Sequence, residues 1–270
     1  MGVADEEYAA FLDMETTAER DSWYRHFLER LPEGSDDEAL RRTFDKKNPP
    51  GFFGHRRALR TDGRYGEWLL SKPFMIVIND VAYAHGGFPE FVAEYGLEGV
   101  NGSLKEDIAG FMRMAEALQD MGLLSPADRF RQIPDVLTVR AEAGQLTDAA
   151  VEIAMQMMEF GDSPLHGPEG PTWYRGTVAC RALVEGDALQ AALDKIGAAR
   201  VVVGHTSTVT RKVQQHMGGR VLEIDTGMLN EVYDGKGHAL VIENGRASVV
   251  SQDGATNLVP TPHPKRIGHE

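Results

Sequence analysis

The sequence has 270 residues, of which 42% are hydrophobic and 26% are charged, a composition typical of globular proteins. Its 28 Lys and Arg residues against 41 Asp and Glu residues give a formal net charge of −13. This excess of acid repels nucleic-acid phosphates and anionic membrane surfaces, and no run of Lys and Arg forms a local exception, so we expect neither to be a partner. A chain of this length can bury a sizeable core, which excludes disorder along its whole length.

Neither the hydropathy nor the single cysteine points to export or membrane insertion. No apolar stretch approaches the ~18 residues that a membrane-spanning helix needs, and residues 1–11 have no basic and apolar regions of a signal peptide. Cys180 cannot form an intramolecular disulfide, which fits a reducing compartment. We therefore expect a cytoplasmic protein in which Cys180 is a buried structural thiol.

The N-terminal region is predicted to be helical and acidic. Aromatic and aliphatic residues at near-helical spacing predict two helices within residues 4–31, and residues 33–37 form a polar break. A short helix is expected over 39–44. The segment Asn-Pro-Pro-Gly at 48–51 ends it because proline removes hydrogen-bond donors, and a loop is expected to follow.

The next segment predicts a β-hairpin. The runs FMIVI (74–78) and VAYAH (81–85) are rich in β-formers and are separated by the turn Asn79-Asp80. The second strand places His85 at its C-terminal end, directly before two glycines.

A long helical region is predicted between the hairpin and the next strand. Residues 88–160 show a helical pattern with a capping box at Ser103-x-x-Glu106. Three prolines leave residues 161–176 with little regular structure, and residues 178–196 are helical again. We interpret 88–160 as a cap region inserted in the domain.

The C-terminal third is predicted to be rich in strands. Residues 199–206 form a β-branched run that is typical of a strand buried on both faces, and His205 follows it. One or two helical turns are expected over 211–217. A strand meander follows, with Asn244-Gly245 as a hairpin turn, at 220–227, 238–244 and 247–252. The tail 261–270 is expected to be frayed, and the whole chain, 1–270, to form a single domain.

Two histidines share one structural context. His85 and His205 each end a predicted strand, so they can converge at the C-terminal edge of a sheet, where α/β folds bind ligands. Neutral imidazole is a common ligand of Zn, Mn and Fe. The alternative is that both are hydrogen-bonded structural histidines.

Two further residues are candidates for a site. Arg175, in the segment WYRG, follows a proline- and glycine-rich loop, and its guanidinium could hold phosphate oxygens or stack on Trp173 or Tyr174. Asp225, in DTG, could form a turn or accept a hydrogen bond from a metal-binding histidine. The sequence contains no G-x-S-x-G, P-loop, G-x-G-x-x-G, H-E-x-x-H or C-x-x-C motif.

Several segments, taken in their order, indicate a family. VAYAHGG (81–87), GPTWYRG (170–176) and VVVGHTST (201–208), followed by VLEIDTGM (221–228), resemble the C-terminal half of calcineurin-like metallophosphoesterases. The resemblance is strongest to the bacterial branch related to Shewanella-like protein phosphatases. The N-terminal segments EEYAAFLD, PPGFFGHRRAL and GRYGEWLL also resemble that branch, so the resemblance covers nearly all of the chain.

This resemblance implies a fold and a chemistry. It implies an α/β fold with a β-sandwich flanked by helices, and a binuclear site of Mn, Fe or Zn at which a metal-bound hydroxide attacks phosphorus. By the same resemblance His85 and His205 are metal ligands, Arg175 binds the phosphoryl oxygens, and Asp225 is a possible partner of a ligand.

The sequence also departs from the family. The motifs G-D-x-H-G, G-D-x-x-D-R-G and G-N-H-E, which supply the remaining ligands, are missing, so the fold is expected to be incomplete and to begin just after G-N-H-E. Two histidines do not complete a binuclear site. A truncated chain, a partner chain that carries the missing motifs, and a remnant kept for binding all remain open. Exposed apolar sheet surface and self-association are expected consequences.

Three functions follow from these observations. The first is metal-dependent hydrolysis of phosphomonoesters, with phosphoserine or phosphothreonine of a protein as substrate by resemblance. The second is hydrolysis of nucleotides or dinucleoside polyphosphates. The third is a non-catalytic interaction protein derived from a phosphoesterase, in which both histidines are structural.

Overall fold

The computed structural model describes residues 5–32, 38–161, 163, 165–244 and 246–259. The chain divides into two compact units: unit 1 is Met1–Lys72 with Glu106–Phe160, and unit 2 is Pro73–Lys105 with Gly161–Glu270. The single domain over 1–270 stays a prediction. The boundary at 105/106 divides the predicted cap region, 88–160, so that most of it belongs to the same unit as the N-terminal helices. The polar break 33–37, Gly245 and the tail 261–270 lie outside the described residues.

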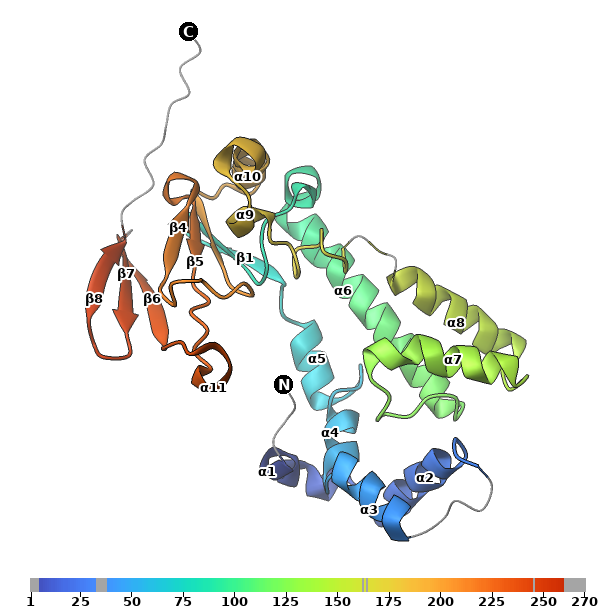
Figure 1. The fold of residues 1–270 in the computed structure, drawn as a ribbon. Coiled ribbons are helices and arrows are strands. Elements are labelled where there is room, and N and C mark those ends of the chain that lie inside the picture. Colours follow the sequence, from blue (N-terminus) through green and yellow to red (C-terminus); the bar gives the residue numbers. More distant parts are fainter. Residues whose placement is uncertain (1–4, 33–37, 162, 164, 245, 260–270) are drawn as a thin grey trace. The chain divides into compact units, whose positions relative to one another are not determined.

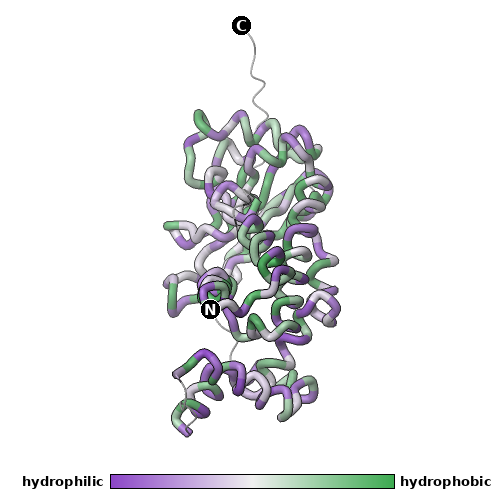
Figure 2. Tube along the Cα trace, turned by 90° about the vertical axis from the view of Figure 1, so that its right-hand side faces the viewer, coloured by the Kyte–Doolittle hydropathy of each residue, from purple (hydrophilic) through white to green (hydrophobic). Residues whose placement is uncertain are grey.

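The regular elements in the described part of unit 1 are all helices (Figure 1). Hydrophobic and hydrophilic residues alternate along these helices (Figure 2), as expected for helices that bury one face. Its elements are α1 (Asp5–Tyr8), the 3₁₀ helix η1 (Ala9–Met14), α2 (Thr17–Leu28), α3 (Glu38–Lys47), α4 (Phe52–Ala58), α5 (Arg64–Leu70), the C-terminal part of α6 (Glu90–Asp120), η2 (Phe130–Gln132), α7 (Ile133–Glu142) and α8 (Asp148–Gly161).

The prediction of a loop after residue 51 is wrong, because α4 and α5 occupy that segment. Gly51 precedes α4 with a left-handed φ of 89°, and a Cβ atom at this position would lie 2.0 Å from the carbonyl oxygen of Tyr8. Glycine therefore lets the chain pass close to α1 and start a new helix. That helix buries Phe52 and Phe53 in an aromatic core with Phe44. Turn rules based on proline do not include the stabilisation that this burial provides.

Unit 2 contains two sheets. The first has the order β1-β2-β3-β5-β4, with β2 parallel to β3 and β3 parallel to β5, and the second has the order β6-β7-β8, all antiparallel. The elements are β1 (Met75–Ile78), β2 (Val81–Ala84), the start of α6, α9 (Gly176–Ala179), α10 (Ala182–Ile196), β3 (Arg200–Val203), β4 (Gln214–His216), η3 (Met217–Gly219), β5 (Val221–Glu223), α11 (Asn230–Tyr233), β6 (His238–Glu243), β7 (Arg246–Ser251) and β8 (Thr256–Val259).

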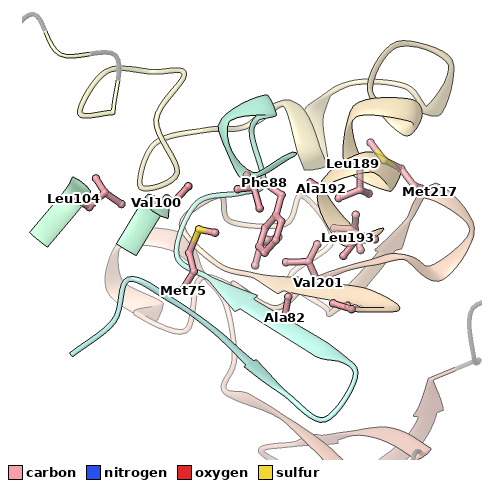
Figure 3. Close-up of a cluster of buried hydrophobic side chains, with 14 residues drawn as sticks. Met75, Ala82, Phe88, Val100, Leu104, Leu189, Ala192, Leu193, Val201 and Met217 are labelled. Atoms are coloured by element: carbon pink, nitrogen blue, oxygen red, sulfur yellow. The ribbon is translucent and has the colours of Figure 1, made fainter. Parts of the chain in front are cut away.

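The central strands of the first sheet, β3 and β5, are buried on both faces. On one face, Val201 and Val203 pack with Leu189 and Leu193 of α10 and with Phe88, in a cluster that Figure 3 shows. On the other face, Val81, Val202 and Leu222 pack against side chains of the second sheet, among them Leu240 and Ile242. The mixed α/β class is thus as predicted, whereas the family-type sandwich with a cap stays a prediction.

The strands agree with the sequence predictions at the hairpin and at the central strand. β1 and β2 pair antiparallel with Ile78 opposite Val81, and Asn79 takes a left-handed φ of 58° in the turn. The buried strand predicted within 199–206 is β3, which has a buried neighbour on each side.

Other local predictions are wrong. The helical turns predicted over 211–217 are not present: Gln214–His216 form the edge strand β4, and only the last residue, Met217, begins the 3₁₀ helix η3. A hydrogen bond between His216 Nε2 and Glu223 Oε2 at 2.8 Å connects β4 to β5. β5 belongs to the first sheet, so the meander is confined to the second sheet, where β8 is an additional strand. Ser103 lies inside α6, so it caps no helix.

The helix expected over 178–196 is interrupted. Residues Gly176–Ala179 form the short α9, Cys180 is its extended C-cap, and α10 starts at Ala182. Cys180 is exposed, so the expectation of a buried thiol is wrong. Cys180 is not among the residues of the core that α10 forms with its buried face.

The edge strand β1 exposes apolar surface. Ile76 is 37% exposed and Ile78 is 52% exposed, and both lie on the face of β1 that continues Val81 and Tyr83 of β2. Such exposed apolar side chains on an edge strand agree with the expected uncovered sheet surface, and self-association stays a prediction. Within the described ranges, no helix combines the length and the apolar character that crossing a bilayer requires.

The free energy of unfolding is predicted to fall as the pH drops below the ordinary histidine pKa of 6.5, partly through His26. This ring is 7% exposed and its Nε2 lies 2.9 Å from Arg30 Nη2. Burial lowers the pKa of His26, and the positive charges of Arg30 and Arg140 lower it further. The carboxylates of Glu29 and Asp128 oppose this shift. The unfolded chain therefore binds a proton that the folded chain does not, which costs at most about 1.4 kcal/mol per pH unit for one group.

Urea unfolding at pH 7.5 and pH 5.5 measures this effect. The His26→Gln variant should lose less stability between the two pH values than the wild-type protein does. The His238→Gln variant, changed in unit 2, is the control and should retain the wild-type pH dependence. Equal pH dependence in wild type and His26→Gln would contradict the prediction.

Candidate functional site

Parallel pairing of β2 and β3 brings two histidines together in unit 2. Ala84 is opposite Val203, and Gly204 N donates a hydrogen bond to the carbonyl oxygen of His85 at 3.0 Å. The strands end at the same edge of the sheet, so His85 and His205 leave it side by side. His85 Nε2 and His205 Nδ1 are 3.0 Å apart, and the ring centroids are 4.8 Å apart.

The backbone and ring of His205 are both unusual. Its φ of 64° is left-handed, which is uncommon for a residue other than glycine. Its Nε2 atom is buried and has no hydrogen-bond partner among the described residues. Burial lowers the pKa of His205, with His85 and Arg175 adding to the effect and Asp225 opposing it. At neutral pH the imidazole is therefore neutral and keeps a lone pair for a ligand.

The segment after His205 carries two more unpaired polar atoms. Thr206 Oγ1 and Thr208 Oγ1 are buried without a hydrogen-bond partner among the described residues. Buried polar atoms are satisfied in the large majority of cases, so three exceptions within residues 205–208 call for an explanation. A bound polar ligand or ion beside this segment would provide one.

Asp225 stabilises the loop that contains these residues. Its Oδ1 accepts hydrogen bonds from Ser207 Oγ at 3.1 Å and from Gly227 N at 2.9 Å, and its carbonyl oxygen accepts one from Thr208 N at 2.8 Å. Within the described residues it makes no hydrogen bond to either histidine ring. Of the two interpretations of Asp225, the structure favours the turn, with an electrostatic influence on His205.

Arg175 reaches the site through aromatic contacts. Trp173 packs edge-on against the His205 ring with centroids 4.8 Å apart, and the Arg175 guanidinium lies 5.9 Å from the centre of the Trp173 ring. Both Trp173 and Arg175 are exposed. Arg175 thus lies over an aromatic ring, as one interpretation expected, and its Nη1 donates a hydrogen bond to the carbonyl oxygen of Trp173 at 3.5 Å.

Two glycines position the segment that carries Trp173 and Arg175. The backbone N–H groups of Gly86 and Gly87 both donate to the carbonyl oxygen of Pro171 at 3.2 Å. A Cβ atom on Gly86 would lie 2.7 Å from Thr172 O, and one on Gly87 would lie 2.7 Å from Thr177 Oγ1. The buried Thr177 Oγ1 in turn accepts a hydrogen bond from Phe88 N at 2.9 Å. Sequence reasoning missed Thr177 because its partner is 89 positions away.

The two imidazole nitrogens lie at hydrogen-bond distance from each other, as expected for structural histidines, and the same spacing also fits two ligands on one metal ion. Two nitrogen atoms each about 2.1 Å from an ion and about 90° apart would be about 3.0 Å from each other, which matches the 3.0 Å between His85 Nε2 and His205 Nδ1. However, the described part of the chain has no group of three or more His, Cys, Asp or Glu residues that could hold an ion. The chain's described residues therefore supply an incomplete ligand set.

The comparisons with known proteins gave matches among solved structures alone. No protein-family model and no curated protein matches the sequence. An isoleucine-to-methionine mutant of a cold-active protein tyrosine phosphatase is similar with 23% identity and a TM-score of 0.49, covering 82% of this chain and 51% of that one. A second structure of a cold-active protein tyrosine phosphatase, at 1.1 Å, has 24% identity, a TM-score of 0.48 and coverage of 82% and 50%.

A further similar structure is the cold-active protein tyrosine phosphatase of a psychrophile Shewanella species. It has 23% identity and a TM-score of 0.48, and the alignment covers 82% of this chain and 51% of that chain. The chain thus spans about half the length of the solved structures it matches.

The Gly87→Ala variant is predicted to be destabilised by about 1–3 kcal/mol, because the added methyl group overpacks a closed contact. The contact is with Thr177 Oγ1 at 2.7 Å and Tyr174 O at 2.8 Å, so Arg175 should also be displaced. Gly102→Ala is the matched control, since a Cβ atom there meets nothing within 4 Å in α6. That variant should be as stable as wild type or more stable by up to about 1 kcal/mol. Urea unfolding of both variants measures the difference, and equal stabilities would contradict the prediction.

Proposed function

We propose that unit 2 carries part of a metal-dependent phosphoester hydrolase site. The observation that carries the proposal is the pair of imidazole nitrogens 3.0 Å apart at the shared end of β2 and β3. The ordered motifs around His85, Arg175 and His205, which resemble those of metallophosphoesterases, also support it. The proposed substrate class is phosphomonoesters, with phosphoserine or phosphothreonine of a protein as the substrate.

In this proposal each residue has a distinct task. His85 and His205 bind one divalent cation, Mn, Fe or Zn, through the neutral nitrogens that face each other. Arg175 binds two phosphoryl oxygens through its planar guanidinium, a geometry that lysine does not offer. Trp173 limits the movement of both groups because it contacts the His205 ring and the Arg175 guanidinium.

Two histidines alone do not hold an ion firmly, so further ligands are part of the proposal. Metal ions in proteins take four to six donors, and the described residues offer no third His, Cys, Asp or Glu at this place. We propose that the other donors come from residues beyond the described ranges or from another polypeptide. No catalytic step is derived from the two histidines alone.

The lack of a third donor among the described residues favours a second candidate function. A site with two imidazoles and one guanidinium can bind a phosphorylated partner without hydrolysing it. In that case the protein is a non-catalytic interaction protein, and Arg175 is the residue that recognises the phosphate. Turnover and binding separate the two functions.

The metal part of the proposal predicts weak Zn²⁺ or Mn²⁺ binding that needs both histidines. By calorimetry, His85→Ala and His205→Ala should each weaken Zn²⁺ binding by about tenfold or more, since each removes one of two ligands. The control His238→Gln, in the second sheet, should bind like wild type. Equal Zn²⁺ affinity of wild type and His205→Ala would overturn the metal site.

The phosphate part predicts a separate phenotype for Arg175. The Arg175→Gln variant should keep the wild-type Zn²⁺ affinity and weaken the binding of phenylphosphonate by about tenfold. Hydrolysis of p-nitrophenyl phosphate with Mn²⁺ by wild type, lost in His205→Ala, would favour the hydrolase. Phosphonate binding without turnover would favour the non-catalytic function.

A further inference from the structure

Unit 1 contains a cavity that the candidate site in unit 2 does not use. Its volume is about 680 Å³, and every residue that lines it belongs to unit 1. A cavity of this size can hold a small organic molecule. Aromatic side chains form much of the wall: Trp23, Phe53, Phe111 and Phe130.

The carboxylates in the wall already have partners. Arg30 binds Asp128 through two hydrogen bonds of 2.6 and 2.8 Å, and Glu116 accepts from the N–H and the hydroxyl of Thr61 at 2.6 and 2.7 Å. Arg60 pairs with Asp120 at 3.3 Å and with Asp62 at 3.7 Å, and Arg57 pairs with Glu19. These pairs compensate the negative charge of the wall, and they also occupy two of its four arginines.

The other two arginines lack a carboxylate partner. Neither Arg56 nor Arg129 forms an ion pair with an acid within the described ranges. The Nε atom of Arg56 is buried and has no hydrogen-bond partner there. Burial lowers the pKa of Arg56, and the nearby Arg129 cation adds to that, while Tyr8 opposes it. A partly buried guanidinium without a counter-charge is costly unless an anion joins it.

Aromatic rings shape the cavity, and its arginines supply the positive charge. The Trp23 and Phe53 rings are stacked at 20° with centroids 6.2 Å apart, and Phe111 lies 5.0 Å from Phe130. The Arg56 guanidinium is itself fixed 4.9 Å above the Phe52 ring. Phe130 is 56% exposed, so an apolar surface remains for a ligand to cover. Flat rings next to guanidinium groups favour a ligand that is aromatic and anionic.

We propose that this cavity binds a small aromatic anion, a carboxylate or a phosphate attached to an aryl ring. The anionic group pairs with Arg56 and Arg129, and the ring packs among Trp23, Phe111 and Phe130. This site is independent of the function proposed for unit 2, because His85, Arg175 and His205 are not among the residues that line the cavity.

Calorimetry on the full chain tests the proposal with three probes of one shape. The probes are 2-naphthoate, the non-hydrolysable 2-naphthylphosphonate and the neutral 2-naphthamide. We expect the two anions to bind at least about tenfold more tightly than the amide, because charge-assisted hydrogen bonds to guanidinium groups depend on the negative charge. Preference for one of the two anions decides between a carboxylate and a phosphate ligand.

Variants test which arginines recognise the charge. Arg56→Gln should weaken the binding of both anions by about tenfold or more and leave the binding of the amide unchanged. Arg129→Gln, at an exposed position, should weaken the anions less, by about threefold to tenfold. The control Arg113→Gln makes the same charge change at an exposed position of α6 outside the cavity wall and should bind every probe like wild type.

The location of the probe is read from the indole N–H signals in ¹H–¹⁵N spectra, assigned by Trp→Phe variants. Trp23 should shift on addition of 2-naphthoate, whereas Trp173, in unit 2, should not. Equal affinities for the acid and the amide, no binding at millimolar concentration, or an equal loss in Arg113→Gln would each overturn the proposal. A cooperative urea unfolding curve for Arg56→Gln is the control that this variant is folded. A loss of binding in Arg129→Gln alone would place the charge recognition at Arg129 and contradict the role of Arg56.

Discussion

The register between β2 and β3 is the constraint on which the candidate site depends. In β3, Val201 and Val203 point into the core with α10, and Val202 points into the core with the second sheet. A shift of one residue would exchange these faces, so both cores oppose it. The register that satisfies them places Gly204 N on the carbonyl oxygen of His85. The distance between the two imidazoles is therefore set by hydrophobic packing some residues before the site.

A second layer of constraint comes from close backbone contacts. Gly86 and Gly87 follow His85 directly, and their missing side chains let the segment 171–177 lie against the end of β2. That segment is held by the Thr177 hydroxyl and by the hydrogen bond between the Tyr174 hydroxyl and Glu185 of α10. A proline-rich loop without regular structure thereby presents Trp173 and Arg175 at a defined place.

Both units contain polar groups that their own side chains do not satisfy. Among the described residues these are His205 Nε2 and the hydroxyls of Thr206 and Thr208 in unit 2, and His55 Nδ1 and Arg56 Nε in unit 1. Each such group costs stability when it is buried without a partner. The cores around them are otherwise well packed, with Leu104, Leu118 and Leu193 fully buried. Unsatisfied polar groups beside well-packed cores favour binding sites in both proposals, one for a metal and a phosphate, the other for an aromatic anion.

The sequence by itself determined the features that depend on neighbours along the chain. Alternation and β-branched runs predicted the hairpin and the buried strand β3, and those two strands carry His85 and His205 to the same edge. The resemblance of the ordered motifs implied the α/β class, and hydropathy was sufficient to predict the absence of a spanning helix in the described part of the chain. These predictions succeed because the signal lies within a few residues of the position concerned.

Only the tertiary structure decided the features that depend on distant partners. The edge strand β4 forms where helical turns were expected, because β5 supplies hydrogen bonds that local propensity does not include. The helices α4 and α5 replace a loop because Phe52 and Phe53 complete an aromatic core. The 3.0 Å spacing of the imidazoles and the unpaired Arg56 in its cavity likewise join residues far apart in the chain. A sequence pattern specifies what a residue can do, and long-range packing decides which groups it meets.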